Sequence, residues 1–274
     1  MIQPLVWQAI LFVPVGAERH LASAIRLRPD AVILDLEDAV APDAKPAARA
    51  ALRGAQAALA RARIDCALRV NGPLRAMVDD LTAADLAQLR AVIVPKCEDT
   101  RGLRNAAELT AGQIALIALI ESPLGLHRLP KIAKLPEVRG LMLGPEDYAA
   151  TLGVNPDKGA LDLVAAQLAI AASPRGLLPI GFPGSIANFR DLDLYASQIA
   201  RGRDLGMRAV AAIHPAQLPV IRALLAPSEA EVAWAETVLA KASVGGAVFA
   251  LDGAMVDAPV IARARQISAA SRRA

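Results

Sequence analysis

Short apolar runs alternate along the chain with longer stretches in which alanine, leucine and arginine recur at helical spacing. The apolar runs have the length of buried strands, and stretches such as 17–27 and 193–206 can each supply a connecting helix. The alternation occurs eight times, which predicts an α/β fold with one parallel TIM (β/α)8 barrel. The candidate strands are 11–14, 31–37, 66–71, 91–96, 114–121, 140–147, 179–184 and 209–215.

Polar or turn residues stand at the carboxyl end of nearly every candidate strand. In a parallel barrel these ends converge on one mouth, where active sites are built. In AVILDLEDAV, residues 31–40, a run suited to a buried strand leads directly into Asp35, Glu37 and Asp38. Buried carboxylates cost solvation energy unless they meet water, a cation or a partner. We therefore expect these acids to face a shared polar cavity.

A doubly wound open sheet is the alternative architecture for alternating strands and helices. Its usual nucleotide-binding signals are missing, because no G-x-G-x-x-G follows the first candidate strand and no P-loop is present. The open sheet therefore ranks second.

The pattern changes after the eighth candidate strand. The segment 227–242 opens with Ser228 as an N-cap and has Glu231 at capping-box spacing, which predicts a helix outside the eight units. A glycine-containing extended segment and a last helix follow. We expect the barrel to occupy residues 1–226 and a helical and extended appendage, 227–274, to cap it or a neighbouring subunit.

Composition narrows the class of protein. Hydrophobic residues make up 55% of the 274 residues, but runs such as 114–120 are far too short to cross a bilayer. A net charge of +3, interspersed charges and 3% aromatic residues argue against nucleic-acid binding. The N-terminus lacks the features of a secretory signal, and Cys66 and Cys97 suggest neither a disulfide framework nor a nucleophile, so we expect a cytoplasmic protein.

Glu121 and Asp147 end the fifth and sixth candidate strands, which are neighbours in a barrel. Mg²⁺ typically takes one or two protein carboxylates, while waters and substrate oxygens complete its octahedron. A helix N-cap or a surface ion pair would also explain either acid. The convergence of several acids at one mouth favours a metal site.

Arg69 lies within a candidate strand, where a charge is costly unless it is paired. Its guanidinium could bind a substrate carboxylate at two points or pair with an acid of the barrel, and the two interpretations are equally supported. For His214, before a proline at a strand end, we favour a hydrogen-bonded structural role.

Several motifs occur in a fixed order from about residue 11 to about residue 268: LFVP, AVILDLEDAV, RVN, VPK, ALIESPLGL, GPEDYAATLG, AIHPAQ and VFALDGAMVDAPVIARA. Together they resemble the citrate lyase β-subunit-like branch of the HpcH/HpaI aldolase/citrate lyase family. The resemblance implies a TIM barrel, Mg²⁺, and carbon–carbon bond cleavage or formation on an acyl-CoA. It also implies that Glu121 and Asp147 are the metal ligands, that Arg69 contacts the substrate carboxylate or the developing enolate, and that Glu37 and Asp38 lie beside the metal.

The resemblance extends to the appendage and to assembly. Asp257 matches the family's acid/base aspartate, which the C-terminal segment delivers to the active site of an adjacent subunit. Homotrimers, sometimes paired into hexamers, are common in such proteins. Lys96 is assigned, with Arg69 and Glu121, to substrate binding.

The expected reaction cleaves, or forms, a 3-hydroxy-acid acyl-CoA thioester such as malyl-CoA, citramalyl-CoA or citryl-CoA, giving an acyl-CoA and a 2-oxo acid. The alternatives are a CoA-independent pyruvate-type class II aldolase and a non-catalytic acyl-CoA-binding barrel. Three departures from the family pattern bear on CoA specificity more than on metal chemistry: VGAE at 15–18, Ala254 in place of a frequent lysine, and the segment 182–191.

Overall fold

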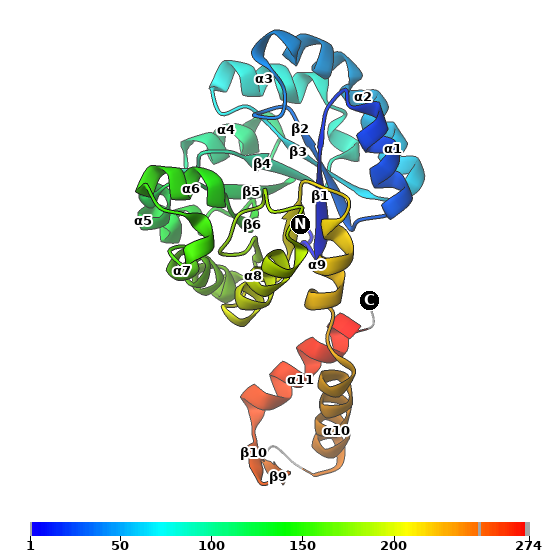
Figure 1. The fold of residues 1–274 in the computed structure, drawn as a ribbon, viewed down its shortest axis with the longest axis vertical. Coiled ribbons are helices and arrows are strands. Elements are labelled where there is room, and N and C mark those ends of the chain that lie inside the picture. The colour runs from blue at the N-terminus through cyan, green and yellow to red at the C-terminus, as the bar shows by residue number, and fades with distance from the viewer. Residues whose placement is uncertain (1, 246–247, 272–274) are drawn as a thin grey trace. The chain divides into compact units, whose positions relative to one another are not determined.

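The computed structural model describes residues 2–245 and 248–271, and the chain divides into two compact units, Met1–Arg222 and Ala223–Ala274. In the first unit eight parallel strands form one sheet in the order β7-β6-β5-β4-β3-β2-β1-β8 (Figure 1). A parallel bridge between Ile180 and Ala209 joins the two ends of this sheet. The predicted TIM barrel is therefore confirmed.

All eight predicted strands are present, but most end earlier than expected. Glu37 and Lys96 follow their strands, and Asp147 lies in the first turn of helix α6 (Pro145–Leu152). Pro145 explains that early helix start, because its fixed φ suits the first helical position. The strands are β1 (Ala9–Pro14), β2 (Ala31–Asp35), β3 (Asp65–Arg69), β4 (Ala91–Val94), β5 (Ala115–Ile120), β6 (Val138–Leu143), β7 (Leu178–Ile180) and β8 (Val210–Ala212).

Helices follow the strands and surround the barrel (Figure 1). Their apolar faces pack inward; α2, for example, buries Ala48, Leu52, Ala55 and Leu59 at helical spacing. The other helices of this unit are α1 (Glu18–Leu27), α2 (Lys45–Ala62), α3 (Leu74–Ala83), α4 (Arg101–Leu109), α5 (Pro123–Ile132), α7 (Asp162–Ala172) and α8 (Leu192–Asp204), and α9 (Gln217–Leu225) crosses its boundary at Arg222.

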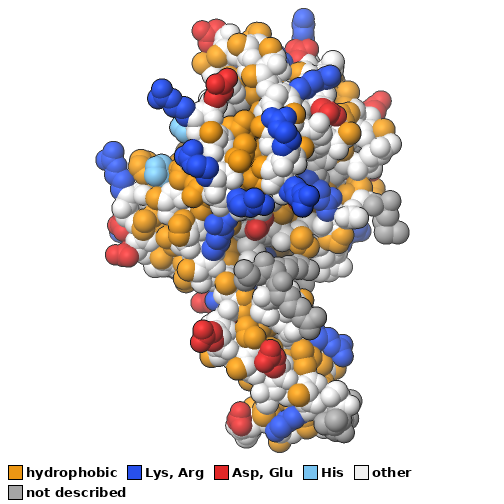
Figure 2. Space-filling view, turned by 90° about the vertical axis from the view of Figure 1, so that its right-hand side faces the viewer, with side chains coloured by type: hydrophobic (Ala, Val, Ile, Leu, Met, Phe, Trp, Pro, Cys, Tyr) orange, Lys and Arg blue, Asp and Glu red, His pale blue; other side chains and the backbone are white. Residues whose placement is uncertain are grey.

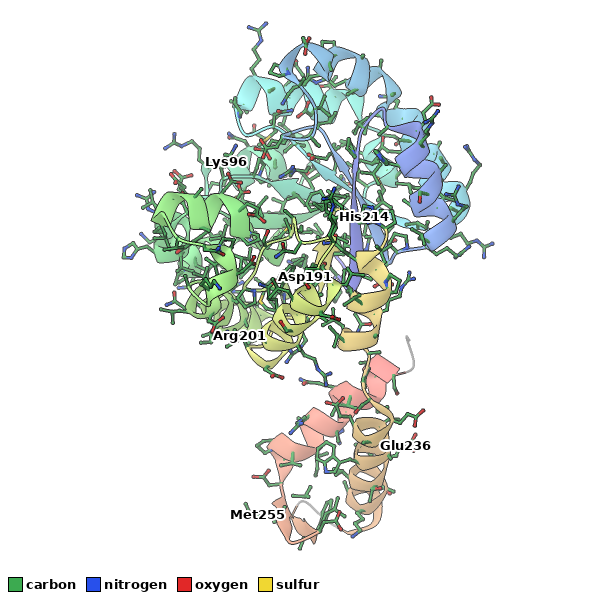
Figure 3. All side chains as sticks on the ribbon, in the orientation of Figure 1. Lys96, Asp191, Arg201, His214, Glu236 and Met255 are labelled. Atoms are coloured by element: carbon green, nitrogen blue, oxygen red, sulfur yellow. The ribbon has the colours of Figure 1, made fainter. Side chains whose placement is uncertain are left out.

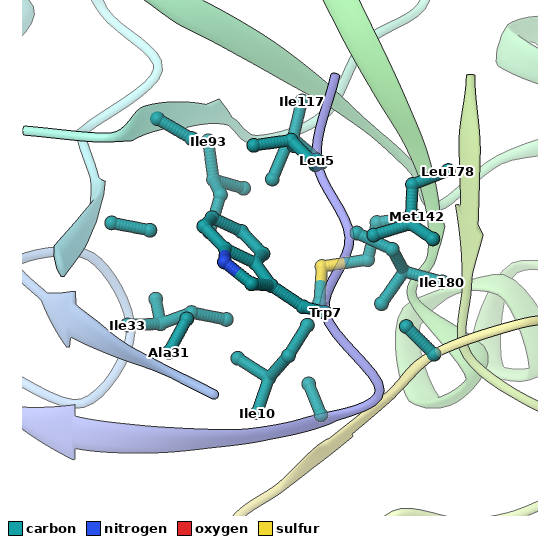
Figure 4. Close-up of a cluster of buried hydrophobic side chains, with 14 of the residues drawn as sticks. Leu5, Trp7, Ile10, Ala31, Ile33, Ile93, Ile117, Met142, Leu178 and Ile180 are labelled. Carbon is teal, nitrogen blue, oxygen red and sulfur yellow. The ribbon is translucent and has the colours of Figure 1, made fainter. Parts of the chain in front are cut away.

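Apolar side chains fill the barrel interior. Figure 4 shows the Trp7 ring among Ile10, Ile33 and Ile93, all of which belong to one buried cluster. The indole nitrogen of Trp7 donates a 2.7 Å hydrogen bond to Asp65 at the start of β3. Because Trp7 precedes β1, this cluster fills the amino end of the barrel and leaves the carboxyl end for polar residues.

The outer surface carries dispersed charge. Lys and Arg side chains are spread over the face of the barrel unit shown in Figure 2, with hydrophobic side chains between them. None of the helices within residues 2–245 and 248–271 is both long and apolar enough to span a bilayer.

The second unit is a small helical layer with one hairpin. Helix α10 (Glu229–Gly245) packs with α11 (Ala258–Ser271), and strands β9 (Phe249–Leu251) and β10 (Ala254–Val256) pair antiparallel between them. The predicted capping box is confirmed, because the Ser228 hydroxyl accepts from the Glu231 amide at 3.2 Å and the Glu231 carboxylate accepts from the Ser228 amide at 2.9 Å. Residues 246 and 247, in the predicted glycine-containing segment, lie outside the described residues.

Candidate active site

A cavity of about 340 Å³ lies at the carboxyl ends of the barrel strands. We distinguish two groups among its lining residues, the charged half and the apolar half; Leu119, Met142 and Leu143 of β5 and β6 also line the cavity and belong to neither group. The charged half comes from β2, β3, β5 and the start of α6 and consists of Asp35, Asp38, Arg69, Glu121, Glu146 and Asp147. The apolar half comes from β1, β8 and the β7–α8 loop and consists of Phe12, Pro14, Phe182, Ile186, Ala211 and Ile213.

Arg69 is locked to Asp35 in the charged half. The parallel register places these two residues opposite each other on β2 and β3, and the guanidinium donates two hydrogen bonds to the carboxylate, at 2.8 and 2.6 Å. The third nitrogen lies 3.1 Å from Glu37, and the guanidinium lies 5.1 Å from the centre of the Phe12 ring. Burial lowers the pKa of Arg69, but Asp35 and the neighbouring acids raise it by more, so the residue stays charged. The internal ion pair is therefore formed. Its two hydrogen bonds occupy the side of the guanidinium that could otherwise bind a substrate carboxylate at two points.

Lys96 connects two acids of the site and is labelled in Figure 3. Its ammonium lies 3.0 Å from Glu37 and 3.8 Å from Asp38. Its backbone has a left-handed φ of 50°, uncommon for a residue with a side chain, and the backbone amide donates to Glu121 at 2.8 Å. Burial raises the pKa of Glu37, while Arg69 and Lys96 partly offset that rise. Lys96 thus fixes Glu121 through its backbone and Glu37 through its side chain.

Glu121 is buried at the end of β5, with 5% of its surface exposed. Burial raises its pKa to about 7, and the charges of Glu37 and Asp147 act in the same direction. Gly144 makes room for this carboxylate, because a Cβ at that position would lie 2.4 Å from the Glu121 Cγ. A nearby cation would stabilise the ionised form of a carboxyl group that is buried in this way.

The donor set of Glu121 and Asp147 suits magnesium. Both carboxylates line the same cavity, and the charge of Asp147 reaches Glu121 strongly enough to raise its pKa. Within the described part of the chain, no group of three or more His, Cys, Asp and Glu residues forms a ready metal cage. Mg²⁺ does not need one, because it commonly takes one or two carboxylates and keeps waters for substrate oxygens to replace.

Glu146 belongs to a polar network that the sequence did not reveal. Its carboxylate accepts a 2.6 Å hydrogen bond from the Ser185 hydroxyl, and the Ser185 amide donates to Asp157 at 2.7 Å. Asn188 and Gln198 also donate to Asp157. Burial raises the pKa of Asp157, but these three donors lower it by more. In the sequence, the segment 182–191 stands out only as a departure from the family pattern. In the structure it is part of a loop that these hydrogen bonds hold beside the cavity.

Residues 8–215 match the HpcH/HpaI aldolase/citrate lyase family. The chain belongs to this family. A citrate lyase subunit β-like protein of Deinococcus radiodurans is 31% identical over 277 residues, with 96% of this chain and 97% of that protein covered. A (3S)-malyl-CoA thioesterase of Cereibacter sphaeroides is 32% identical over 271 residues, with 95% and 93% covered. The predicted family and enzyme class, a lyase, are confirmed.

A solved relative also supports the fold. The structure of the CitE protein from Mycobacterium tuberculosis in complex with magnesium, acetoacetate and coenzyme A has a TM-score of 0.78 and 31% identity. The alignment covers 97% of this chain and 98% of that one.

His214 and the cysteines have structural surroundings in this family member. The His214 Nδ1 accepts from the Ala216 amide at 3.1 Å, and its ring stacks on Phe189 with centroids 4.9 Å apart, which agrees with the structural role favoured from the sequence.

Cys66 and Cys97 are both buried and form no disulfide with each other, and burial raises the pKa of each thiol to about 12. Neither thiol is a ready nucleophile.

Asp257 lies in the second unit, directly before α11. Its carboxylate accepts from the Val260 amide at 3.4 Å, the contact of a helix N-cap. Ala254, where lysine is frequent in the family, lies on β10. The capping contact explains an aspartate at this position without excluding a second role.

The turn at 15–18 borders a second cavity of about 340 Å³. Small and apolar side chains of this turn and of α2 line it, and Pro14 also lines the first cavity. Gly16 has a φ of 91° here, so glycine suits this turn.

Proposed function

We propose that the chain is a Mg²⁺-dependent carbon–carbon lyase for 3-hydroxy-acid CoA thioesters of the malyl-CoA, citramalyl-CoA and citryl-CoA type. The carrying observation is that Glu121, Asp147 and the clamped Arg69 face one cavity at the carboxyl ends of the strands. The CitE complex with magnesium and coenzyme A supports the choice of metal and of thioester.

In this proposal Glu121 and Asp147 hold the metal, with Glu37 and Asp38 beside it. The bound cation would supply Lewis acidity at the substrate hydroxyl and carboxylate oxygens. Arg69 and Lys96, which both contact Glu37, supply positive charge beside the metal site for the negative charge that develops on the thioester enolate. The pairing with Asp35 holds the guanidinium in place, so it reaches substrate through its third nitrogen or through its field.

The reaction needs no co-reactant. The bond between the carbinol carbon and the carbon next to the thioester breaks, the hydroxyl loses its proton, and the departing enolate takes one up. The products are an acyl-CoA and a 2-oxo acid. We propose that Asp257 donates that proton and that the second unit brings it to the cavity of a neighbouring subunit in a homotrimer or hexamer. The cytoplasmic location and the absence of nucleic-acid partners stay predictions.

A substrate panel tests the function. The three thioesters are incubated with Mg²⁺, and the acyl-CoA and the 2-oxo acid are quantified together, with EDTA as the control. Equimolar release of both products supports the lyase. Aldol cleavage of free 2-oxo acid adducts, with no reaction of the thioesters, would point to the CoA-independent aldolase. Binding of the thioesters without turnover would point to the non-catalytic barrel.

A second candidate is hydrolysis of the same thioesters. It is favoured by the 32% identity to a protein named (3S)-malyl-CoA thioesterase. The panel separates the two reactions, because hydrolysis releases free CoA and the intact hydroxy acid, with its carbon–carbon bond unbroken. A thiol reagent added to each reaction would detect that CoA.

A further inference from the structure

The apolar half of the cavity contains an isoleucine with an unusual degree of exposure. Ile213 follows β8 and is 44% exposed, whereas Asp35, Arg69 and Glu121 lie at the carboxyl ends of β2, β3 and β5. Ile186, from the β7–α8 loop, lines the same cavity, and the buried ring of Phe182 lies beneath the loop's start. Exposed apolar surface inside a cavity gains free energy when a ligand covers it.

One buried glutamine fixes both isoleucines. Gln217 has no exposed surface, and its side-chain amide donates to the Ile186 carbonyl at 2.9 Å. Its carbonyl accepts from the Ile213 amide at 3.0 Å. Ser185, next to Ile186, is also tied to Glu146 and Asp157. The backbone at both isoleucines is therefore held in place, which favours selectivity by shape.

The apolar half lacks a counter-charge. Among the described residues that line the cavity, Arg69 is the only basic one, and it belongs to the charged half. A carboxylate placed against Ile186 and Ile213 would lose hydration without gaining a partner.

The three candidate thioesters differ at a single position. The carbinol carbon carries hydrogen in malyl-CoA, methyl in citramalyl-CoA and carboxymethyl in citryl-CoA. If the hydroxyl and carboxylate on this carbon face Glu121 and Asp147, this third substituent is free to meet the opposite wall. Its chemistry then decides which thioester the cavity accepts.

We infer that Ile186 and Ile213 form an apolar subsite for an alkyl group on the carbinol carbon, so the enzyme prefers a citramalyl-type thioester and produces a 2-oxo acid with a terminal alkyl group. This inference rests on the proposed lyase function. Gln217 is a positioning residue of this subsite.

The test is a comparison of kcat/KM for the three thioesters with Mg²⁺ present. One extra methyl group in an apolar pocket typically improves kcat/KM about tenfold or more, so citramalyl-CoA is expected to exceed malyl-CoA by that factor and citryl-CoA to rank last. In the Ile186→Ala/Ile213→Ala double variant, the ratio of kcat/KM for citramalyl-CoA to kcat/KM for malyl-CoA is expected to fall from about tenfold or more to about one, because the methyl group loses its apolar contacts. Turnover of malyl-CoA also reports that the variant is folded.

Two single variants serve as checks. Ile213→Ala alone removes a side chain that is already 44% exposed, so it reduces the methyl preference with little effect on folding. Ile170→Ala is the matched control, because Ile170 is 70% exposed on α7 and does not line the cavity. It is expected to leave all three rates unchanged.

The outcomes separate the two proposals. Cleavage of any of the thioesters upholds the lyase function, and the ranking alone decides the subsite. A wild-type preference for malyl-CoA or citryl-CoA, or an equal loss on all three substrates in the double variant, would overturn the apolar subsite. If none of the three is cleaved, the lyase function fails and the subsite fails with it.

Discussion

The charged half and the apolar half of the cavity share one set of strand ends but hold their side chains by different means. In the charged half the contacts are made to the side chains themselves: Asp35 binds the Arg69 guanidinium, and Lys96 binds Glu37 through its ammonium and the Glu121 carboxylate through its backbone amide. In the apolar half the backbone is held instead, with one glutamine behind two isoleucines. The contacts in the charged half set the electrostatics of the site, and those in the apolar half fix the shape of the cavity wall.

This difference separates catalytic power from selectivity. Interactions with developing charge change the height of the barrier, so losses in the charged half should affect every substrate. Contacts with a non-reacting substituent change the ranking of substrates, so losses in the apolar half should affect only some of them. Variants in the charged half can test this distinction.

The largest effect is expected at Glu121. Glu121→Gln removes the charge of a proposed metal ligand, and turnover of every thioester should fall by at least about a thousandfold because metal stabilisation of the transition state is worth several kcal/mol. Calorimetric titration should show weakened Mg²⁺ binding with the fold intact by circular dichroism. Glu108→Gln, on the exposed side of α4, is the matched control. Wild-type Mg²⁺ affinity in Glu121→Gln would remove this residue from the ligand set.

Asp257 tests whether the charged half is complete within one chain. Asp257→Ala should lower kcat by roughly a hundredfold or more, as loss of a general acid does, while Mg²⁺ binding stays normal. Mixing it with Glu121→Gln under subunit exchange should restore part of the activity, because a mixed oligomer can combine an intact aspartate with an intact metal site. Exchange verified by mass spectrometry without recovered turnover would argue against a contribution from a neighbouring subunit.

A smaller effect is expected at Arg69. Arg69→Lys keeps the charge but loses the two-point contact with Asp35, so kcat should fall by about tenfold or more with a lesser change in KM. Steady-state kinetics on two thioesters would show whether the loss is equal for both. Arg101→Lys is the control, because Arg101 is 84% exposed and pairs with Asp99 at the surface. An unchanged kcat in Arg69→Lys would leave Arg69 with only its structural ion pair.

The charged half could be foreseen from the sequence to a large extent. The eight-fold alternation predicts the barrel, and parallel strand ends that carry Glu121 and Arg69 predict a shared mouth. Two details needed the three-dimensional register: Asp35 faces Arg69 because β2 and β3 align them, and Asp147 lies in a helix because Pro145 starts one. The exact ends of strands depend on such local contacts.

The apolar half could not be foreseen in the same way. Ile213 and Ile186 look like ordinary core residues in the sequence, and nothing in the spacing connects them. Their link is Gln217, whose hydrogen bond to Ile186 spans 31 positions of the chain. The anchoring of Ser185 by Asp157 likewise joins residues 28 positions apart. Long-range side-chain to backbone contacts leave no periodic signal.

The last expected effect concerns the dependence of stability on pH and also distinguishes the two halves. Burial raises the pKa of Glu121 from 4.5 to about 7, so between these values the folded protein binds a proton that the unfolded chain does not. Unfolding then releases a proton, and the free energy of unfolding falls as pH rises through this window. A shift of this size corresponds to about 3 kcal/mol of lost folding stability, which is fully present above pH 7 and absent below pH 4.

Without divalent cations, Glu121→Gln should therefore be more stable than the parent at pH 8 and similar at pH 4, as measured by urea unfolding at each pH. The Ile186→Ala/Ile213→Ala variant, which alters no titrating group, should keep the parental pH slope. If the free energy of unfolding depended on pH in Glu121→Gln as it does in the parent, the Glu121 carboxylate would not be the group that titrates. The positive charges already present in the charged half would then compensate this carboxylate without a metal.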